Sequence, residues 1–293
     1  MAITADARIQ TIAGAGIGLR LPHLAEVVAT RPSVGWLEVH PENFLANPHA
    51  LELLTDLARD YAISVHTVGI SIGSADGVDR VHLGRLRAVV DDLDPVMVSG
   101  HLAWSAFGGT YLNDLLPMPY TDEALRLIVA HLAEVQDVLG RPYVLENPSS
   151  YVAVATSMMT ELEFLHALVD HTGCRLLCDV GNVHLSGANM AYDAHRFIDE
   201  FPAAAVAEVH LGGFTPEPDE ATPGGVVLID THATSIAEPV WELYAHAIRR
   251  FGPQPTIVEW DNDLPALDVL CGEAVKADRV TERGLEVRHA DAC

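Results

Sequence analysis

The chain has 293 residues, of which 49% are hydrophobic and 20% are charged, and this composition excludes an intrinsically disordered protein. It contains no run of about 18 uncharged apolar residues, so a membrane-spanning helix is not expected. The 41 acidic residues outnumber the 17 basic ones and give a formal net charge of -24, which argues against non-specific binding of nucleic acid.

Short apolar segments alternate with segments of helical character along the chain. We predict strands, in chain order, at residues 16–21, 35–40, 62–68, 96–101, 142–147, 175–180, 205–210 and 256–260. The segments between them, such as 123–140, place apolar residues three and four positions apart, as amphipathic helices do. This alternation implies parallel strands joined by right-handed crossovers, and eight such units favour a closed (β/α)8 TIM barrel in the α/β class.

An open, doubly wound α/β sheet is the alternative architecture. It is disfavoured because the glycines of GAGIGLR, residues 14–20, lack the spacing of a dinucleotide-binding loop. No repeat or Pro-rich linker divides the chain, so we assign residues 1–275 to one barrel domain. Residues 276–293 lack a long apolar face and are expected to form a loose C-terminal tail.

The cysteines and the N-terminus indicate a cytoplasmic protein. Cys174, Cys178, Cys271 and Cys293 form no CxxC pair and no dense framework, so we expect reduced thiols. The N-terminal segment has no basic region before its short apolar stretch, which argues against a signal peptide.

Side chains able to bind metal stand at the ends of the predicted strands. Every strand after the first delivers a carboxylate, an imidazole or both: Glu38, His40, His66, His101, Glu146, Asp179, Glu208, His210, Glu259 and Asp261. In a TIM barrel these strand ends share one rim, so the side chains are expected to converge. Such a set of unpaired polar groups would be unstable unless a cation held it. Imidazoles and carboxylates without thiolates suit zinc, manganese or iron.

The candidate ligands exceed the needs of one ion, so more than one ion is expected. Four residues, one from each of the last four strands, are expected to surround a central ion and to carry the catalysis: Glu146, Asp179, His210 and Glu259. His66 and His101 come from the third and fourth strands, on the other side of Glu146, which would bridge to a second ion.

A third ion is predicted beside the loop after the seventh strand. Asp230 and His232 are two positions apart, and in an extended loop alternate side chains share a side. With either Asn182 or His184 they could complete a ligand set.

Residues that face the substrate are sought around the same rim. The connection at 102–122 mixes aromatic residues, glycine and proline and could line a peptide groove, or it could be a packed structural loop. Asn147 could contact substrate or brace Glu146, and Arg20 could hold a ligand carboxylate or form a structural salt bridge. The candidates for substrate binding are Trp104, Asn113, Asn147, Tyr151, His184 and Asp261.

Several longer motifs resemble one family throughout residues 14–275. The matching runs are GIGLR, WLEVHPENF, HTVGISIGS, VSGHLAWS, YLNDLLPMPYT, LENPSSY, CDVGNVHLSG, EVHLGGF, LIDTHA, PVWELY and IVEWDNDLP. By these motifs the chain resembles the multinuclear non-heme iron-dependent oxidative enzymes. That family includes the iron enzyme of methanobactin biosynthesis and was long catalogued as an uncharacterised protein family.

The resemblance implies a barrel similar to xylose isomerase and endonuclease IV that holds two or three iron ions in a mixed Fe(II)/Fe(III) state. One iron would lie between His66, His101 and Glu146. The next would lie among Glu146, Asp179, His210 and Glu259. The third would take Asn182, Asp230 and His232, so the family pattern favours Asn182 over His184.

The resemblance also implies the reaction and the partners. The family uses dioxygen to oxidise cysteine residues of a ribosomally made precursor peptide, giving heterocycle and thioamide products. A small partner protein commonly recognises the leader of the precursor. Two positions depart from the family pattern: relatives often have an aromatic residue where His184 stands and a histidine where Phe214 stands.

Two other classes of function compete with this interpretation. A divalent-metal hydrolase or isomerase could use the same ligands, although the net charge of -24 opposes DNA as a substrate. An aldose–ketose isomerase would lack a suitable lysine, because Lys276 is the only one. A non-catalytic protein that merely retains metal is the third possibility.

Overall fold

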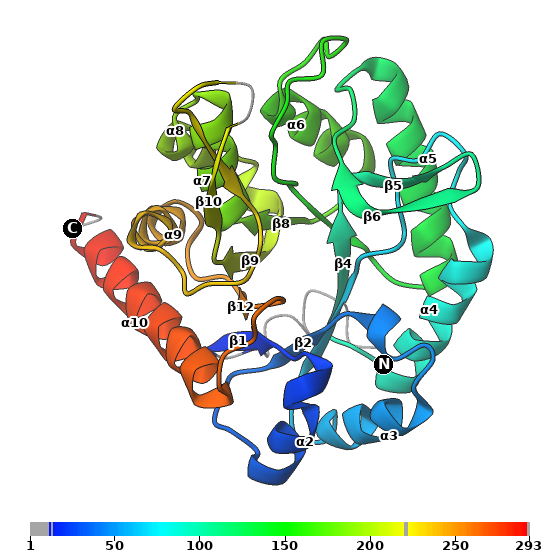
Figure 1. Ribbon diagram of the computed structural model, residues 1–293, viewed down its shortest axis with the longest axis vertical. Helices are drawn as coiled ribbons and strands as arrows, with labels where there is room; N and C mark the ends of the chain where they lie inside the picture. The colour runs from blue at the N-terminus through cyan, green and yellow to red at the C-terminus, as the bar shows by residue number, and fades with distance from the viewer. Residues whose placement is uncertain (1–11, 13, 220–221, 292–293) are drawn as a thin grey trace.

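The computed structural model describes residues 12, 14–219 and 222–291. Within them, eight parallel strands close a barrel in the order β1-β12-β9-β8-β7-β4-β3-β2 (Figure 1). The barrel strands are β1 (Ala15–Gly18), β2 (Leu37–Val39), β3 (Ile63–Thr67), β4 (Met97–His101), β7 (Val144–Glu146), β8 (Leu176–Asp179), β9 (Val206–Gly212) and β12 (Thr256–Glu259). The predicted TIM barrel is therefore confirmed, and each predicted strand overlaps one of these eight.

Helices surround the barrel and join successive strands. They are α2 (Leu21–Thr30), α3 (Pro48–Leu57), α4 (Arg80–Leu93), α5 (Asp122–Leu139), α6 (Glu161–Thr172), α7 (Val180–Met190), α8 (Ala194–Glu200), α9 (Glu238–Phe251) and α10 (Leu267–Asp291), with single 3-10 turns at Pro41–Asn43 and Ala203–Ala205. The side chains of Asp79, Thr121 and Thr160 cap α4, α5 and α6 by accepting backbone N–H groups of the first turn. Among the described residues, no helix combines the length and the apolar character that a bilayer crossing requires.

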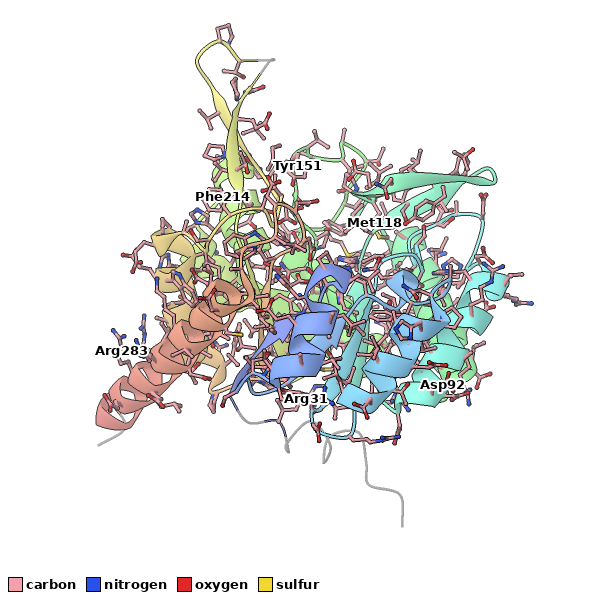
Figure 2. All side chains as sticks on the ribbon, turned by 60° about the horizontal axis from the view of Figure 1, so that its bottom comes forward. Arg31, Asp92, Met118, Tyr151, Phe214 and Arg283 are labelled. Atoms are coloured by element: carbon pink, nitrogen blue, oxygen red, sulfur yellow. The ribbon has the colours of Figure 1, made fainter. Side chains whose placement is uncertain are left out.

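Two hairpins outside the barrel were not predicted. β5 (Trp104–Phe107) pairs with β6 (Thr110–Leu116), and β10 (Thr215–Pro218) pairs with β11 (Val226–Ile229). Both follow the carboxyl ends of barrel strands, β4 and β9 respectively. Figure 2 shows the β10–β11 hairpin, in yellow, projecting beyond the rest of the molecule.

The barrel interior is layered because side chains alternate along each strand. A buried apolar cluster of Trp36, Met97, Val144, Leu177, Ala207 and Ile257 is separate from the larger core between strands and helices. Two residues further along the same strands lie polar residues, including Glu38 after Trp36 and Ser99 after Met97. Glu38 on β2 reaches His210 on β9, and these strands are not neighbours in the barrel, so the contact crosses the interior.

The predicted loose tail is instead helical as far as it is described. Helix α10 continues from Leu267 to Asp291, so residues 276–291 belong to it. Ala277 is fully buried, and the Tyr244 hydroxyl hydrogen-bonds Thr281 Oγ1 at 2.7 Å. The buried positions of α10 within the predicted tail are small residues, so the sequence shows no long apolar face there.

Close packing of α10 predicts a position-dependent effect of added bulk. Ala277→Leu is expected to lower the free energy of unfolding by about 1–3 kcal/mol, because no space surrounds this fully buried side chain. Arg279→Leu, two positions along on the exposed side of the helix, is the matched control and should change it by less than about 0.5 kcal/mol. Chemical denaturation measures both; equal effects would show that α10 does not pack as described.

Candidate metal centre

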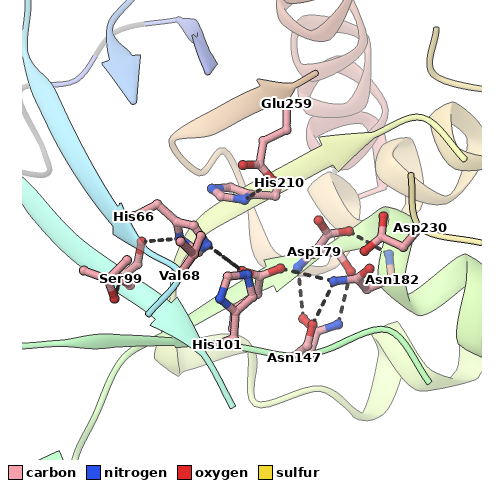
Figure 3. Close-up of polar contacts among 12 residues, drawn as sticks. His66, Val68, Ser99, His101, Asn147, Asp179, Asn182, His210, Asp230 and Glu259 are labelled. Carbon is pink, nitrogen blue, oxygen red and sulfur yellow. Dashed lines mark hydrogen bonds and ion pairs between the residues drawn. The ribbon is translucent and has the colours of Figure 1, made fainter. Parts of the chain in front are cut away.

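Seven predicted ligands meet at the carboxyl ends of the barrel strands. Figure 3 shows their side chains pointing toward one another from different strands. Six of these side chains are at least 97% buried: His66, Glu146, Asp179, Asn182, His210 and Glu259. The seventh, His101, is partly buried. Five of the seven, His66, His101, Glu146, Asn182 and Glu259, line a cavity of about 350 Å³ together with Asp230 and His232. The expected convergence at one rim is therefore observed.

The first group joins β3, β4 and β7. His66 Nε2 lies 3.2 Å from Glu146 Oε2 and 3.1 Å from His101 Nε2, and His101 Nε2 lies 3.4 Å from the same Glu146 oxygen. Two ligands that each bind an ion at about 2.1 Å are separated by roughly 3.0–3.4 Å. The three donor atoms therefore have the spacing of ligands around one cation.

The second group lies beside the first and comes from β7, β8, β9 and β12, with the ring centroids of His66 and His210 5.1 Å apart. His210 Nδ1 is 3.0 Å from Glu259 Oε2. Ligand atoms of Glu146, Asp179 and His210 also lie within 4.8 Å of one another, which makes a second candidate metal group that shares Glu146 with the first. The bridging position predicted for Glu146 thus has a geometric basis.

The third predicted group is only partly assembled. His232 Nε2 lies 2.9 Å from Asp230 Oδ1, as the two-residue spacing predicted. His232 also falls in a candidate group with Asp179 and Glu259. Asn182 instead donates its amide to Glu146 Oε1 and to the Asn147 carbonyl, both at 3.1 Å.

Gly212 makes room for His232. A Cβ atom at position 212 would lie 2.4 Å from the His232 ring, so no other residue fits without displacing it. His232 itself has a left-handed backbone with φ 45, which turns the loop back over the barrel mouth.

Unpaired buried atoms test whether this set fits a metal. Three oxygen atoms of the proposed ligands are buried and have no hydrogen-bond partner: Glu146 Oε2, Asp179 Oδ2 and Asn182 Oδ1. Each such group costs about 1–3 kcal/mol when it stays unsatisfied. Oxygen and imidazole donors without thiolate suit divalent transition metals. Cys178 packs in the core between strands and helices, and burial raises the pKa of its thiol, so it does not join the set.

Burial favours the neutral forms of the first group and of Asp179, which belongs to the second group. It lowers the pKa of His66 well below the usual range and that of His101 to about 4, so both imidazoles offer lone pairs at neutral pH. Burial raises the pKa of Glu146 strongly and that of Asp179 to about 7. Without metal, these two carboxyl groups therefore tend to hold protons.

The second group is held by opposite charges. Burial alone would lower the pKa of His210, but the Glu38 and Glu259 carboxylates raise it well above its usual range. Burial likewise opposes ionisation of Glu259, yet the positive charge of His210 holds the pKa of this carboxyl well below its usual range. A bound cation would take over the role of the His210 proton.

Metal binding is expected to release protons and to strengthen as the pH rises from about 5 to 8. Asp179, with a pKa of about 7, and Glu146 must lose their protons to bind a cation, whereas His101, with a pKa of about 4, is already deprotonated. Calorimetric titration with Zn²⁺ in buffers of different ionisation enthalpy counts these protons. Asp179→Asn should reduce the count; an affinity independent of pH would contradict the assignment.

Two buried residues brace the ligands. Asn147, predicted to bind substrate or brace Glu146, uses its side chain on the backbone of Asp179: it accepts from the N–H at 2.9 Å and donates to the C=O at 3.2 Å. It is 1% exposed, and these two hydrogen bonds fit the predicted bracing role better than contact with substrate. Arg20 forms salt bridges with Glu259 and Asp261, so of its two predicted roles the structural one is observed.

The remaining substrate candidates divide into two sets. Asn113, Tyr151 and Asp261 line the cavity, as predicted. Trp104 is the first residue of β5; its Nε1 donates to the Pro117 carbonyl at 2.8 Å, and it lines a separate pocket instead of the cavity, so its contact with substrate stays a prediction.

His184 is also absent from the residues that line the cavity in the described part of the chain. Its ring instead packs against Phe214 with the centroids 5.4 Å apart. His184 and Phe214 are therefore neighbours in the structure.

Other cavity residues were not singled out as substrate contacts. Asp114 and Leu115 belong to β6, and His40 follows β2. Tyr111, Asn113 and Leu115 alternate along β6, so recognising the hairpin would have identified this lining. Glu38 and Glu208 were noted at strand ends but assigned no role, although each stands two residues before a histidine.

The fold and the site define a TIM barrel with a candidate metal centre of several imidazoles and carboxylates at the carboxyl ends of its strands. Residues 14–282 match the model of the family described as "RiPP precursor modification enzyme MbnB/TglH/ChrH", where RiPP denotes a ribosomally synthesised and post-translationally modified peptide. The chain belongs to this family.

Relatives by sequence carry the description "UPF0276 protein". One from Vibrio parahaemolyticus is 46% identical over 264 residues, covering 89% of this chain and 90% of that protein. One from Paraburkholderia phytofirmans is 42% identical over 269 residues, covering 91% of this chain and 86% of that protein.

Solved structures with the same fold include an L-ribulose 3-epimerase, with a TM-score of 0.61 and 16% identity, covering 96% of this chain and 97% of that one. A xylose isomerase-like TIM barrel protein from Mycobacterium smegmatis, in complex with magnesium, has a TM-score of 0.59 and 14% identity, covering 97% of this chain and 100% of that one. At this identity the likeness concerns the fold alone.

Proposed function

We propose that this protein is a multinuclear non-heme iron enzyme that uses dioxygen to oxidise cysteine residues of a ribosomally made precursor peptide. Membership of a family of precursor modification enzymes supports a peptide substrate. The observation that carries the proposal is the convergence of buried donor atoms from β7, β8 and β9: ligand atoms of Glu146, Asp179 and His210 lie within 4.8 Å of one another, next to the cavity that Glu146 lines. The described cysteines are free thiols, in accord with action in the reducing cytoplasm.

The proposed ligands form two metal positions. His66, His101 and Glu146 would hold one ion, and Glu146, Asp179, His210 and Glu259 the next. The second set has three carboxylates and the first has one, so the second would hold the ion of higher charge. Bound iron would supply a coordination position for the cysteine thiolate and electrons for the reduction of dioxygen.

The protein groups around the ions control position and protons. Arg20 holds Glu259 and Asp261 in place, and Asn147 fixes the strand end that carries Asp179. Because burial raises the pKa of Glu146, this carboxyl binds a proton readily whenever its link to an ion weakens. Protons produced by oxidation of the peptide thus have an acceptor at the site.

The cavity mouth has the properties expected of a peptide-binding surface. Large apolar side chains are exposed on β6, among them Tyr111 (54%) and Leu115 (36%), and on the neighbouring loop at Tyr151 (37%). Tyr151 is anchored there by the Asp230 backbone N–H, which donates to its hydroxyl at 2.9 Å. We propose that the precursor, delivered by a small leader-recognising partner protein, crosses this surface to place a cysteine in the cavity.

Co-expression tests the reaction directly. With the cysteine-containing precursor encoded beside its gene, and any small partner protein encoded there, the enzyme is expected to remove hydrogen from the peptide in air, which mass spectrometry detects as a mass decrease. Asp179→Asn should abolish the change and Trp104→Phe should retain it. An unmodified peptide in the presence of the iron-loaded enzyme would contradict the proposal.

Metal analysis of variants tests the bridging role of Glu146. Protein purified without oxygen is expected to contain two to three iron ions. Glu146→Ala should empty two adjacent positions and His101→Ala only one, because only Glu146 belongs to both candidate groups. Asp114→Ala, at an exposed residue of the cavity mouth, is the control and should retain all ions. Loss of a single ion from Glu146→Ala would exclude the bridge.

The alternative of a divalent-metal hydrolase or isomerase gives a different result in the same analysis. Stoichiometric zinc without iron, after expression in iron-replete medium, would favour it. The one lysine, Lys276, lies on α10 above the Trp241 ring and does not line the cavity, so it cannot serve an isomerase there.

A further inference from the structure

A polar layer lies directly beneath the side chains proposed to bind metal. It consists of Glu38, Ser64, Ser99 and Glu208, which are all 0% exposed and occupy the strand positions between the apolar cluster at the barrel base and the ligands above. Nothing in the proposed function accounts for two fully buried carboxyl groups at this depth. Both carboxyl groups lie close to the same proposed ligand, His210.

Two ligand histidines each direct one ring nitrogen down into this layer. His66 Nδ1 lies 2.8 Å from Ser99 Oγ, while its Nε2 faces Glu146. His210 Nε2 lies 3.1 Å from Glu38 Oε1, while its Nδ1 faces Glu259 at 3.0 Å. In both rings one nitrogen faces the polar layer and the other faces the proposed metal positions.

We propose that Glu38 is a positioning residue that fixes His210 for metal binding through Nδ1. Glu38 Oε1 is the nearest carboxylate oxygen to His210 Nε2, at 3.1 Å, although the two atoms are not aligned as a hydrogen bond. The negative charge of Glu38 favours the hydrogen on Nε2 and leaves the Nδ1 lone pair for the ion. Ser64 Oγ donates to Glu38 Oε2 at 2.7 Å and so holds the carboxylate in this orientation. This inference rests on the proposed metal centre and assigns the residue that orients one of its ligands.

Glu208 is the rival for this role. Its Oε1 lies 3.5 Å from His210 Nε2, farther than the 3.1 Å to Glu38. The pairing of β8 with β9 shifts register between Leu176 and Leu177, so Ala207 has no partner residue on β8. As a result, Glu208 faces the barrel interior. Distance therefore favours Glu38 as the direct partner, with Glu208 behind it.

The two histidines consequently differ as ligands. His66 is supported by a neutral hydroxyl group, and His210 by a carboxylate. A carboxylate behind an imidazole makes the ring a stronger base and a stronger ligand, and loss of such a partner typically weakens metal affinity by about 10–100-fold. Removal of the Glu38 charge should therefore weaken one metal position and spare the other.

Cobalt(II) binding to the full-length protein tests this without reference to catalysis. Competition with a chelator gives the dissociation constants, and anomalous diffraction gives the occupancy of each position. Glu38→Gln is expected to weaken the ion bound by His210 by about 10–100-fold and to leave the ion bound by His66 and His101 unchanged. Glu208→Gln should have a smaller effect, and Ser99→Ala should instead weaken the ion bound by His66.

The outcomes separate this inference from the proposed function. Unchanged cobalt affinity in Glu38→Gln, equal loss at both positions, or a larger loss in Glu208→Gln would overturn the role of Glu38 while the metal centre stands. Absence of bound cobalt in the unaltered protein would overturn the metal centre itself. Thermal unfolding of the metal-free proteins controls for folding. If Glu38→Gln does not fold, Ser64→Ala removes the donor to Glu38 and should weaken the same position, by a smaller factor.

Discussion

The carboxyl groups of Glu38, Glu146, Asp179, Glu208 and Glu259 lie inside one barrel and are almost wholly removed from water. Ionised carboxylates at this depth are unstable unless positive charge or protons compensate them. The imidazoles and one guanidinium group supply part of that charge, and the raised pKa values of several acids show that protons supply more. The shape of the site follows from this requirement for cations.

The layers of the barrel meet that requirement in sequence. The apolar cluster around Trp36 closes the amino end, so water does not reach the acids from below. The polar layer above it fixes ring nitrogens, and only the next layer meets the cavity. Asn147 and Arg20 hold ligands from the side. Four of the proposed ligands are each contacted by a polar residue from another segment of the chain: His66 by Ser99, Asp179 by Asn147, His210 by Glu38 and Glu259 by Arg20. These contacts hold the donor atoms in place.

The barrel and most of its ligands could be predicted because one signal served both. Parallel strands buried on two faces are continuous runs of Val, Ile and Leu, and the first polar residue after each run marks the rim. This signal is absent from the elements that were not predicted. The hairpins are exposed antiparallel strands without such runs, and α10 packs through small residues such as Ala277. In the described part of the chain, Trp104 and His184 do not line the cavity, because their neighbours in space, Pro117 and Phe214, are set by those hairpins and loops.

The barrel is closed by the pairing of its first strand, β1, with its last, β12, and β12 also carries Glu259. A chain still emerging from the ribosome without β12 lacks both the closing strand and that carboxylate. Completion of the proposed ligand set and closure of the barrel therefore depend on the same short strand, Thr256–Glu259, late in the chain.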